Sequence, residues 1–285
     1  MTGPAIAVTG ATGRLGGRVA RRLAAAGVPQ RLLVRDPGRA PELPGAEIAV
    51  ATYDQPDAAR AALRGVRTLF MVSGKETPDR LADHTAFVDA AAAAGVERIV
   101  YTSFYGAAPD ATFTHARLHW ATEEYLRAAP PAVVALRDNL YLDFATSLMG
   151  DDGVIRGPAG QGRFSPVAQD DIADAAVAIL LDPAPHEGRV YDLTGPEELT
   201  LTEVAAGLTA HLGREVRYVE ETLEEAYASR AHYGAPDWEV EAWVSTYTAI
   251  AAGEMAGVSP AVPILTGHPA TSLEQLFPPG AGARA

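Results

Sequence analysis

Short apolar runs alternate with stretches of helical periodicity through the first half of the chain. The first run covers residues 5–9, and after it Leu15, Val19 and Leu23 recur at the spacing of one helix face. Later apolar runs lie at 31–35, 47–51, 68–73, 97–103 and 133–137, separated by helical patterns at 57–63, 79–94 and 114–129. Because parallel strands need a long crossover connection, usually a helix, this alternation predicts an α/β fold with a doubly wound parallel sheet.

A glycine turn joins the first predicted strand to the first helix, with glycines at positions 10, 13 and 16. The first permits a sharp turn, the second lets the backbone approach a pyrophosphate, and the third lets the helix pack closely on the strand. N–H groups at the helix start then face the phosphates. Glycines often serve a loop alone, but the flanking strand and helix predict a Rossmann-type dinucleotide site. Its expected binding residues are Gly10, Thr12, Gly13, Arg14, Leu15 and Gly16.

The pattern changes after residue 137, where regularity falls and glycines accumulate between 153 and 162. A helix at 171–181 with an acidic cap and a strand at 189–193 predict a return to the first sheet. A helix at 200–212 has Thr202 as its expected cap and ends at Gly213, and further helical stretches lie at 221–232 and 238–252.

These segments predict two interleaved domains. The dinucleotide-binding domain covers 1–137 and regains 165–194. A smaller α+β substrate domain covers 138–164 and 195–278. The Pro- and Gly-rich residues 279–285 are expected to form a disordered tail.

Composition and charge narrow the class of protein. The chain has 285 residues, a formal net charge of -13 and no cysteine. The negative charge disfavours nucleic acid and anionic membranes as partners, and the lack of cysteine excludes disulfides and thiol chemistry. No apolar stretch is long enough to span a bilayer, and no signal-peptide pattern precedes the first strand. We therefore expect a cytoplasmic protein, monomeric or homodimeric, that binds a small molecule.

The end of the second strand predicts which dinucleotide is bound. In this fold an acidic residue there bonds the adenosine ribose, whereas arginine accommodates a 2'-phosphate. Arg35 ends the strand, with Arg14 in the glycine turn and Arg39 nearby, so we expect NADP(H) to be preferred over NAD(H). Asp36 leaves an alternative open, since it either points at a ribose or forms a turn before Pro37.

A set of motifs over nearly the whole chain resembles a known family. The motifs are Thr9-Gly10-Ala11-Thr12-Gly13-Arg14-Leu15-Gly16, Val34-Arg35-Asp36-Pro37, Tyr101-Thr102-Ser103, His119 with Thr122-Glu123, Leu136-Arg137, Asp170-Asp171-Ile172-Ala173, Tyr191-Asp192-Leu193-Thr194-Gly195 and Leu265-Thr266-Gly267-His268-Pro269. Together they resemble the NmrA-like group of atypical short-chain dehydrogenases/reductases, and most of all its NADPH-dependent quinone oxidoreductase branch. The resemblance implies reductases of quinones and other small molecules, and also NADP-binding regulators without known turnover.

The sequence lacks the Tyr-x-x-x-Lys pair of ordinary short-chain dehydrogenases, and its only lysine, Lys75, follows the fourth strand. Hydride transfer to a conjugated acceptor leaves a delocalised anion that needs little proton assistance. His119 lies on the helix where the pair would be and matches the histidine of the quinone reductase branch. It would either protonate the product or bond the nicotinamide ribose, unless it is simply a half-buried helix histidine. His115 lies one turn from it, but no third metal ligand is evident, so we expect no metal.

Further candidate residues follow the fourth, fifth and sixth strands. Ser73, Gly74 and Lys75 leave the fourth strand, and they and Thr102 are expected at the cofactor. Ser103 is placed to hold a substrate oxygen, although a serine that caps a loop is the commoner case. With His119 and Tyr141 it makes up the predicted catalytic set. The residues expected to contact a flat, mostly apolar acceptor are Tyr105, Asn139, Tyr141, Phe144 and Phe164, each of which taken alone is more often core.

The sequence therefore predicts an NADPH-dependent reductase that transfers a hydride to a quinone or a similar conjugated carbonyl compound. The alternative is an NADP-binding sensor that changes conformation or partner with redox state and performs no turnover. A reductase of a secondary-metabolite pathway is a third alternative, which the sequence does not separate from the first.

Overall fold

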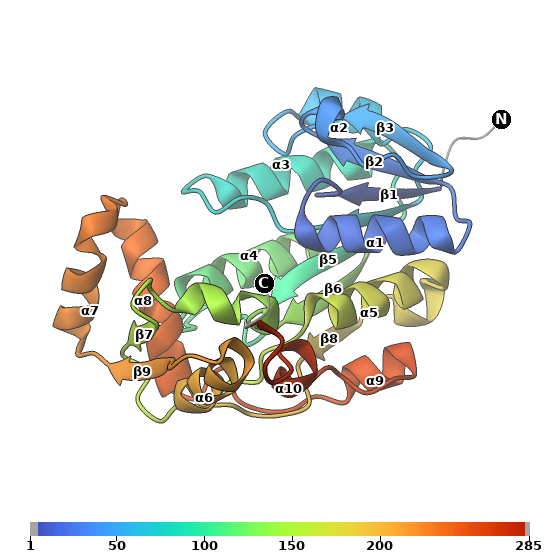
Figure 1. Ribbon diagram of the computed structural model, residues 1–285. Coiled ribbons are helices and arrows are strands. Elements are labelled where there is room, and N and C mark those ends of the chain that lie inside the picture. Colours follow the sequence, from blue (N-terminus) through green and yellow to red (C-terminus); the bar gives the residue numbers. More distant parts are fainter. Residues whose placement is uncertain (1–4, 283–285) are drawn as a thin grey trace.

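The computed structural model describes residues 5–282 and contains a seven-stranded parallel sheet in the order β3-β2-β1-β4-β5-β6-β8 (Figure 1). The strands are β1 (Ile6–Thr9), β2 (Gln30–Val34), β3 (Ala46–Val50), β4 (Thr68–Met71), β5 (Arg98–Phe104), β6 (Ala132–Asp138) and β8 (Val190–Leu193). This arrangement confirms the predicted Rossmann-type sheet. The strand near residue 190, β8, pairs with β6 and is the last strand of this sheet.

Helices cover both faces of the sheet. One face carries α1 (Arg14–Ala25) and α5 (Gln169–Leu181), which pack against each other. The other carries α2 (Pro56–Ala62), α3 (Arg80–Ala93) and α4 (Thr114–Ala128), with α3 in contact with both neighbours. This layering is visible in Figure 1.

Alternate residues of the central strands enter two separate cores. Val8, Phe70 and Val100 pack with α1 and α5, whereas Leu69 and Ile99 pack with α2, α3 and α4. Because both faces are covered, these strands are buried on both sides. They are therefore recognisable in the sequence as continuous apolar runs.

The second predicted domain, hereafter the second domain, has a separate hydrophobic core. Its elements are the parallel strand pair β7 (Val154–Gly157) and β9 (Arg217–Glu220), with α6 (Leu201–Leu212), α7 (Leu223–Arg230), α8 (Asp237–Ala251) and α10 (Leu273–Leu276). A short helix, α9 (Ala261–Thr266), packs on α5 and β8, so this part of the predicted substrate domain lies on the main sheet. Short 3-10 helices cover Pro37–Arg39, Leu142–Leu148, Ala184–His186 and Ala231–Tyr233.

Two predicted helix caps were wrong. The N-cap of α6 is Thr200, which forms a capping box with Glu203, whereas Thr202 lies inside the first turn. The N-cap of α5 is Ala168, which has no capping side chain. The carboxylate of Asp143, distant in sequence, accepts from the N–H of Gln169 at 2.8 Å and so takes over the role of a cap. A cap supplied from elsewhere in the chain leaves no local sequence signal.

Residues 279–282 of the predicted tail lie against α6, where the N–H of Gly280 donates to the carbonyl oxygen of Ala210 at 2.9 Å. Residues 283–285 lie outside the described part of the chain. Within residues 5–282, no helix is long and apolar enough to cross a membrane.

The glycine turn leads to a test of the fold. A Cβ at Gly16 would lie 2.4 Å from the carbonyl oxygen of Gly10 and 2.5 Å from that of Thr9. Both are backbone atoms that cannot move aside, so Gly16→Ala should lower the free energy of unfolding by about 2 kcal/mol or more in a urea titration. Alanine's better helix propensity, about 1 kcal/mol, acts in the other direction and is too small to compensate.

Gly38→Ala is the matched control. Its Cβ would meet only the flexible carboxylate of Asp36, at 3.3 Å. We expect its unfolding free energy to stay close to that of the wild type. Equal stabilities for the two variants would contradict the close packing of α1 on β1.

Candidate active site

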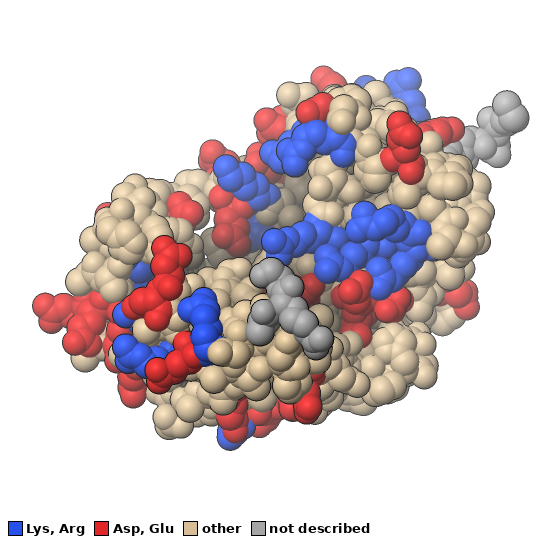
Figure 2. All heavy atoms as spheres, in the orientation of Figure 1, with Lys and Arg blue, Asp and Glu red and all other residues tan. Residues whose placement is uncertain are grey.

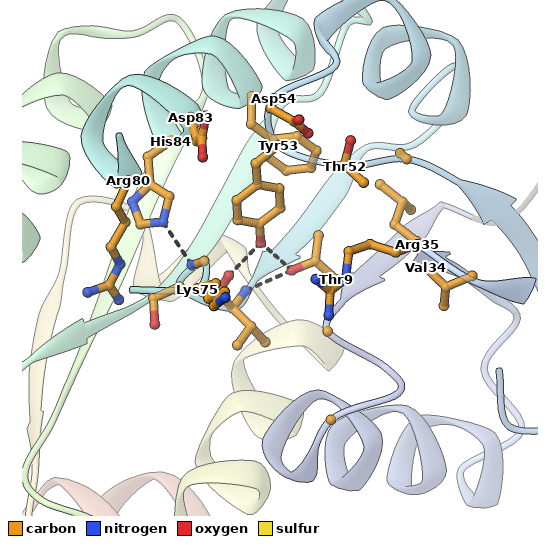
Figure 3. A pocket seen from close by; sticks show the side chains of 18 of the residues that line it. Thr9, Val34, Arg35, Thr52, Tyr53, Asp54, Lys75, Arg80, Asp83 and His84 are labelled. Carbon is orange, nitrogen blue, oxygen red and sulfur yellow. Dashed lines mark hydrogen bonds between the residues drawn. The ribbon is translucent and has the colours of Figure 1, made fainter. Parts of the chain in front are cut away.

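The candidate site lies at the carboxyl edge of the sheet, at the point where strand order reverses beside β1. In doubly wound sheets ligands bind in the crevice at this position. A cavity of about 430 Å³ opens there, between the segments that follow β1, β2, β3 and β4 and the start of α3 (Figure 3). Figure 2 shows the surface hollowed between the sheet domain and the part formed by α7 and α8.

The glycine turn forms one wall of this cavity. Gly10 has a positive φ of 64°, and the N–H of Gly13 donates to its carbonyl oxygen at 2.8 Å. Thr12 and Gly13 line the cavity, so the N–H groups of the first turn of α1 lie beside it. Leu15 instead packs in the core. The structure thus brings Gly10, Thr12 and Gly13 of the predicted set to the cavity, whereas Leu15 and Gly16 serve packing and Arg14 is exposed.

A hydrogen-bonded triangle joins the ends of β1, β3 and β4 (Figure 3). The hydroxyl of Tyr53 donates to the carbonyl oxygen of Val72 at 2.5 Å and lies 2.7 Å from Oγ1 of Thr9. Oγ1 of Thr9 accepts from the N–H of Val72 at 2.9 Å. Burial raises the pKa of Tyr53, so it remains a neutral phenol. The triangle fixes three strand ends that surround the cavity.

Arg35 reaches the cavity from the end of β2, as predicted. The carboxylate of Asp36 accepts from the N–H of Gly38 at 2.9 Å, so this residue forms the turn, and it is not among the residues that line the cavity. Arg39 is exposed on the 3-10 helix that follows. Arg14 lies outside, with its guanidinium carbon 5.0 Å from the ring centroid of Phe144. One of the three predicted phosphate-binding arginines therefore lines the cavity.

Basic side chains also gather over α1, as Figure 2 shows. Arg18 is paired there with Asp143 at 2.9 Å, and Arg22 with Asp170 and Asp174 at 2.7 Å each. These ion pairs join α1 to α5 and to the 3-10 helix Leu142–Leu148. The patch is therefore partly neutralised and is a packing feature.

The loop after β4 forms the opposite wall, with Ser73, Gly74 and Lys75 at the cavity. The N–H of Ser73 donates to Oγ1 of Thr102 at 2.7 Å, and that of Gly74 donates to Nε2 of His84 at 2.8 Å. Burial, and then the positive charge of Arg80, lowers the pKa of His84 to about 3. Its ring is therefore neutral and accepts the hydrogen bond from Gly74. Thr102, predicted at the cofactor, is buried and holds the loop from behind.

His119 lies behind Arg80, a cavity-lining residue, and is only 6% exposed. Its Nε2 is 3.2 Å from Nη2 of Arg80, and its Nδ1 is 2.9 Å from the hydroxyl of Tyr101. Because arginine only donates, Nε2 accepts and the ring proton sits on Nδ1. Burial, and then the charge of Arg80, lowers the pKa of His119 well below its ordinary value. With a neutral ring and both nitrogens bonded to the protein, its roles as proton donor and ribose ligand stay predictions.

Ser103 faces a buried charge cluster. Its hydroxyl donates at 2.5 Å to Glu123, which is 1% exposed and also accepts from Arg127 at 2.6 Å and Arg137 at 2.7 Å. The carboxylate is thus fully compensated by two arginines and a hydroxyl. The structure gives Ser103 a structural partner, and its substrate role stays a prediction.

Tyr141 lies at the end of β6 beside a buried carboxyl group. Its hydroxyl lies 3.1 Å from Oδ2 of Asp138. Within residues 5–282, Oδ1 of Asp138 has no hydrogen-bond partner. Burial raises the pKa of Asp138 and that of Tyr141 well above their ordinary values. Both groups therefore favour their neutral forms.

The remaining predicted substrate residues link the sheet to the second domain. Tyr105 donates to the carbonyl oxygen of Ala256 at 2.6 Å, and Nδ2 of Asn139 donates to that of Met255 at 3.0 Å. Phe164 is 3% exposed and belongs to the core of the second domain. Their contacts are those of structural residues, and their substrate roles stay predictions.

The predicted histidine pair does not share a ligand position. Nε2 of His115 lies 3.3 Å from a carboxylate oxygen of Glu76, whereas His119 is bonded to Arg80 and Tyr101. Among residues 5–282, no group of three histidine or acidic side chains is placed to hold a metal ion.

Sequence reasoning missed Tyr53, His84 and Arg80. Tyr53 follows a strand at the ligand edge, the same position that identified Ser73. Arg80 and His84 sit at helical spacing with Phe87, a buried position on α3. The sequence signal that could have identified Arg80 and His84 is the presence of a charged or titratable residue on the buried face of a helix. What these side chains contact depends on the neighbouring elements and cannot be read from the sequence.

Comparisons with known proteins give the class. The model of the NmrA-like family matches residues 3–251. The chain is 34% identical to the NAD(P)H azoreductase of Xenophilus azovorans over 275 residues, which is 95% of this chain and 96% of the relative. It is 33% identical to quinone oxidoreductase 2 of Escherichia coli (strain K12) over 278 residues, 95% of this chain and 96% of the relative.

A solved structure agrees with these matches. The NADPH-dependent quinone oxidoreductase of Escherichia coli, crystallised with NADPH, superimposes with a TM-score of 0.86 at 32% identity and covers 95% of this chain and 98% of its own. The fold and the site define a Rossmann-type dinucleotide-binding protein. The chain belongs to the NmrA-like family, as its motifs predicted.

The buried carboxyl group of Asp138 leads to a prediction of how the stability of the fold depends on pH. Because the pKa of Asp138 is raised in the folded state, its contribution is fully present below its ordinary pKa of 3.8 and is lost as the pH rises through the folded value. Asp138→Asn keeps the acceptor for Tyr141 and removes the ionisation. We expect its stability relative to the wild type, measured by urea titration, to increase between about pH 5 and about pH 8.

Asp152→Asn serves as the control. Asp152 is exposed, and its hydrogen bond to Arg156 lowers its pKa to about 2, so the stability from its ionised form is present above its ordinary pKa of 3.8 and is lost only as the pH falls toward about 2. The stability of this variant relative to the wild type should therefore stay constant between about pH 5 and about pH 8. A pH-independent difference between Asp138→Asn and the wild type would show that Asp138 is not a buried neutral acid.

Proposed function

We propose that this chain is an NADPH-dependent reductase that transfers a hydride to a quinone or a similar flat, conjugated carbonyl compound. The observation that carries the proposal is the cavity at the glycine turn, which has Arg35 on one side, Arg80 on the other and the first turn of α1 between them. Phosphates fit the helix start and the exposed Arg35, and the rest of the lining comes from the segments after β3 and β4 and from α3.

The assignment to the nicotinamide-dependent oxidoreductases rests on the relatives. Full-length relatives named as NAD(P)H azoreductase and quinone oxidoreductase confirm that the chain is an oxidoreductase that uses a nicotinamide cofactor. Azo compounds and quinones are both electron-poor conjugated systems. This shared chemistry supports a conjugated acceptor for the present chain.

The residues around the cavity fit NADPH. Backbone groups of Thr12 and Gly13 would receive the pyrophosphate, Arg35 the 2'-phosphate, and the loop at Ser73 and Lys75 would contact the cofactor between them. NADPH supplies the hydride when bound. Among the other predicted cofactor residues, Gly16 permits the close packing of α1 on β1, whereas Arg14 and Arg39 are exposed and do not line the cavity.

The protein offers positioning rather than strong base catalysis. The pKa of Tyr101 and that of Tyr141 are raised by burial, so neither supplies the tyrosinate of ordinary short-chain dehydrogenases. An acceptor that takes a hydride without prior protonation suits such a site. Tyr141 and Phe144, with ring centroids 5.6 Å apart, are the proposed apolar contacts of the acceptor. Solvent would supply the final proton.

A small-molecule substrate follows from this class. The cytoplasmic location and the monomeric or homodimeric state stay predictions.

Turnover tests the proposal directly. Purified protein with NADPH and a simple naphthoquinone should consume NADPH, read as loss of its absorbance, at a rate proportional to protein concentration. The control is the same mixture without quinone. Tight binding of NADPH with no turnover over a panel of quinones and conjugated carbonyl compounds would contradict the proposal and favour the sensor.

Cofactor preference tests the role of Arg35. A guanidinium on a phosphate contributes one or more charge-assisted hydrogen bonds, so Arg35→Ala should raise the KM for NADPH by about tenfold or more. The KM for NADH should change by less than about threefold, because NADH has no 2'-phosphate. Arg21→Ala, which removes an exposed arginine of α1, is the matched control and should change neither. Equal increases for both cofactors would refute the assignment.

A further inference from the structure

Arg80 is a buried cation at the edge of the cavity. It is the first residue of α3, is 4% exposed and lines the cavity. Nη2 contacts His119 at 3.2 Å, but Nε and Nη1 have no hydrogen-bond partner within residues 5–282. Buried donors are ordinarily paired, and a buried charge without a partner is costly. An unpaired guanidinium beside a cavity is therefore expected to have a partner among the ligands of that cavity.

The groups around Arg80 do not compensate its charge. His119 and His84 are neutral because burial and Arg80 itself depress the pKa of each ring. The carboxylate of Glu76 interacts first with His115, at 3.3 Å, and more weakly with the charge of Arg80. Its side chain is 55% exposed, so water screens its charge from the buried guanidinium.

Arg80 lies on the side of the cavity opposite to Arg35, where the adenosine of the cofactor is proposed to bind. Figure 3 shows Arg80 and Arg35 on opposite sides of the cavity, with Tyr53 between them. Arg35 follows β2, whereas Arg80 contacts His119 of α4. The charge of Arg80 also lowers the pKa that burial raises in Tyr141, at the end of β6. A dinucleotide whose 2'-phosphate lies at Arg35 would extend across β1 toward this side.

We infer that Arg80 donates hydrogen bonds from its free N–H groups to the acceptor oxygen on which negative charge develops as the hydride arrives. The inference rests on the proposed function. It makes Arg80 a catalytic residue and His119 a positioning residue, whose Nε2 holds the guanidinium in place. It also supplies electrostatic stabilisation in a site that lacks the Tyr-x-x-x-Lys pair.

The chemistry balances with the components already named. The C–H bond at C4 of the reduced nicotinamide breaks, and the hydride forms a new C–H bond on the conjugated acceptor. The displaced π electrons move to the carbonyl oxygen, which becomes an oxyanion beside Arg80. The cofactor is oxidised to NADP+, the acceptor is reduced by two electrons, and a proton from solvent neutralises the oxyanion.

A substrate class follows from this placement. Acceptors with a carbonyl oxygen conjugated to the reacting carbon gain a charge partner in Arg80. Positively charged acceptors, whose reduction discharges a cation, gain nothing and are repelled in the bound state. Arg80 therefore selects neutral or anionic conjugated carbonyl compounds.

Binding of two matched inert ligands tests the inference without turnover. In protein saturated with NADP+, a hydroxynaphthoquinone that is ionised at neutral pH presents an oxyanion, and its methoxy analogue presents the same ring without the charge. Calorimetry should show the wild type binding the ionised ligand about tenfold or more tightly than its analogue, the factor expected of one charge-assisted hydrogen bond. Arg80→Gln should remove that preference and change the Kd of NADP+ by less than about threefold.

Two further variants complete the design. Arg80→Lys keeps the positive charge and should retain part of the preference, which also covers failure of the glutamine variant to fold. Arg60→Gln, which replaces an exposed arginine of α2, should behave as the wild type. Turnover of a neutral quinone by Arg80→Gln should fall about a hundredfold or more through kcat.

Three results would overturn the inference. The first is a wild type that binds the ionised ligand no more tightly than its methoxy analogue. The second is an Arg80→Gln variant in which the affinity for both ligands falls equally, and the third is a rise in the Kd of NADP+ in that variant as large as the rise in the Kd of the ionised ligand. The last would place Arg80 on the cofactor instead. Failure of the proposed function is read separately, as absence of quinone turnover by the wild type.

Discussion

The site depends on the close approach of the first helix to the first strand. At Gly16 the carbonyl oxygens of Thr9 and Gly10 occupy the space that any side chain would need. Only this contact lets α1 begin at the tip of β1, so that its first N–H groups lie beside the cavity. On its other side β1 pairs with β4, and there Thr9 ties Tyr53 and Val72 together. Backbone sterics at Gly16 therefore set the phosphate site, and strand pairing sets the opposite wall.

Around this frame the protein buries polar groups that are mostly paired. The loop after β4 is held by Thr102 and His84, and Glu123 is neutralised by two arginines. Such pairing makes the exceptions informative, because a buried donor without a partner costs more than a typical hydrogen bond contributes. Arg80 is such an exception and lies at the cavity. The site thus combines a framework whose buried polar groups are mostly hydrogen-bonded with one buried guanidinium, that of Arg80, whose Nε and Nη1 have no partner within residues 5–282.

The sequence predicts the framework better than the chemistry. Buried parallel strands and the glycine turn leave local patterns, so the sheet, Arg35 and the loop at Ser73 follow from the sequence. Contacts between distant segments leave no such pattern. The cap of α5 comes from Asp143, and the pairing of His119 with Arg80 depends on how α3 packs against α4. Ser103 illustrates the limit, since its position at the strand end is right but its hydroxyl turns toward Glu123.

A crystal structure of the protein with NADPH and an ionised hydroxynaphthoquinone tests the account most directly. It should show the 2'-phosphate on Arg35, the pyrophosphate at Thr12 and Gly13, and the ligand oxygen within hydrogen-bond distance of the free N–H groups of Arg80. A pyrophosphate on Arg80, or a nicotinamide ring directed away from it, would contradict the account.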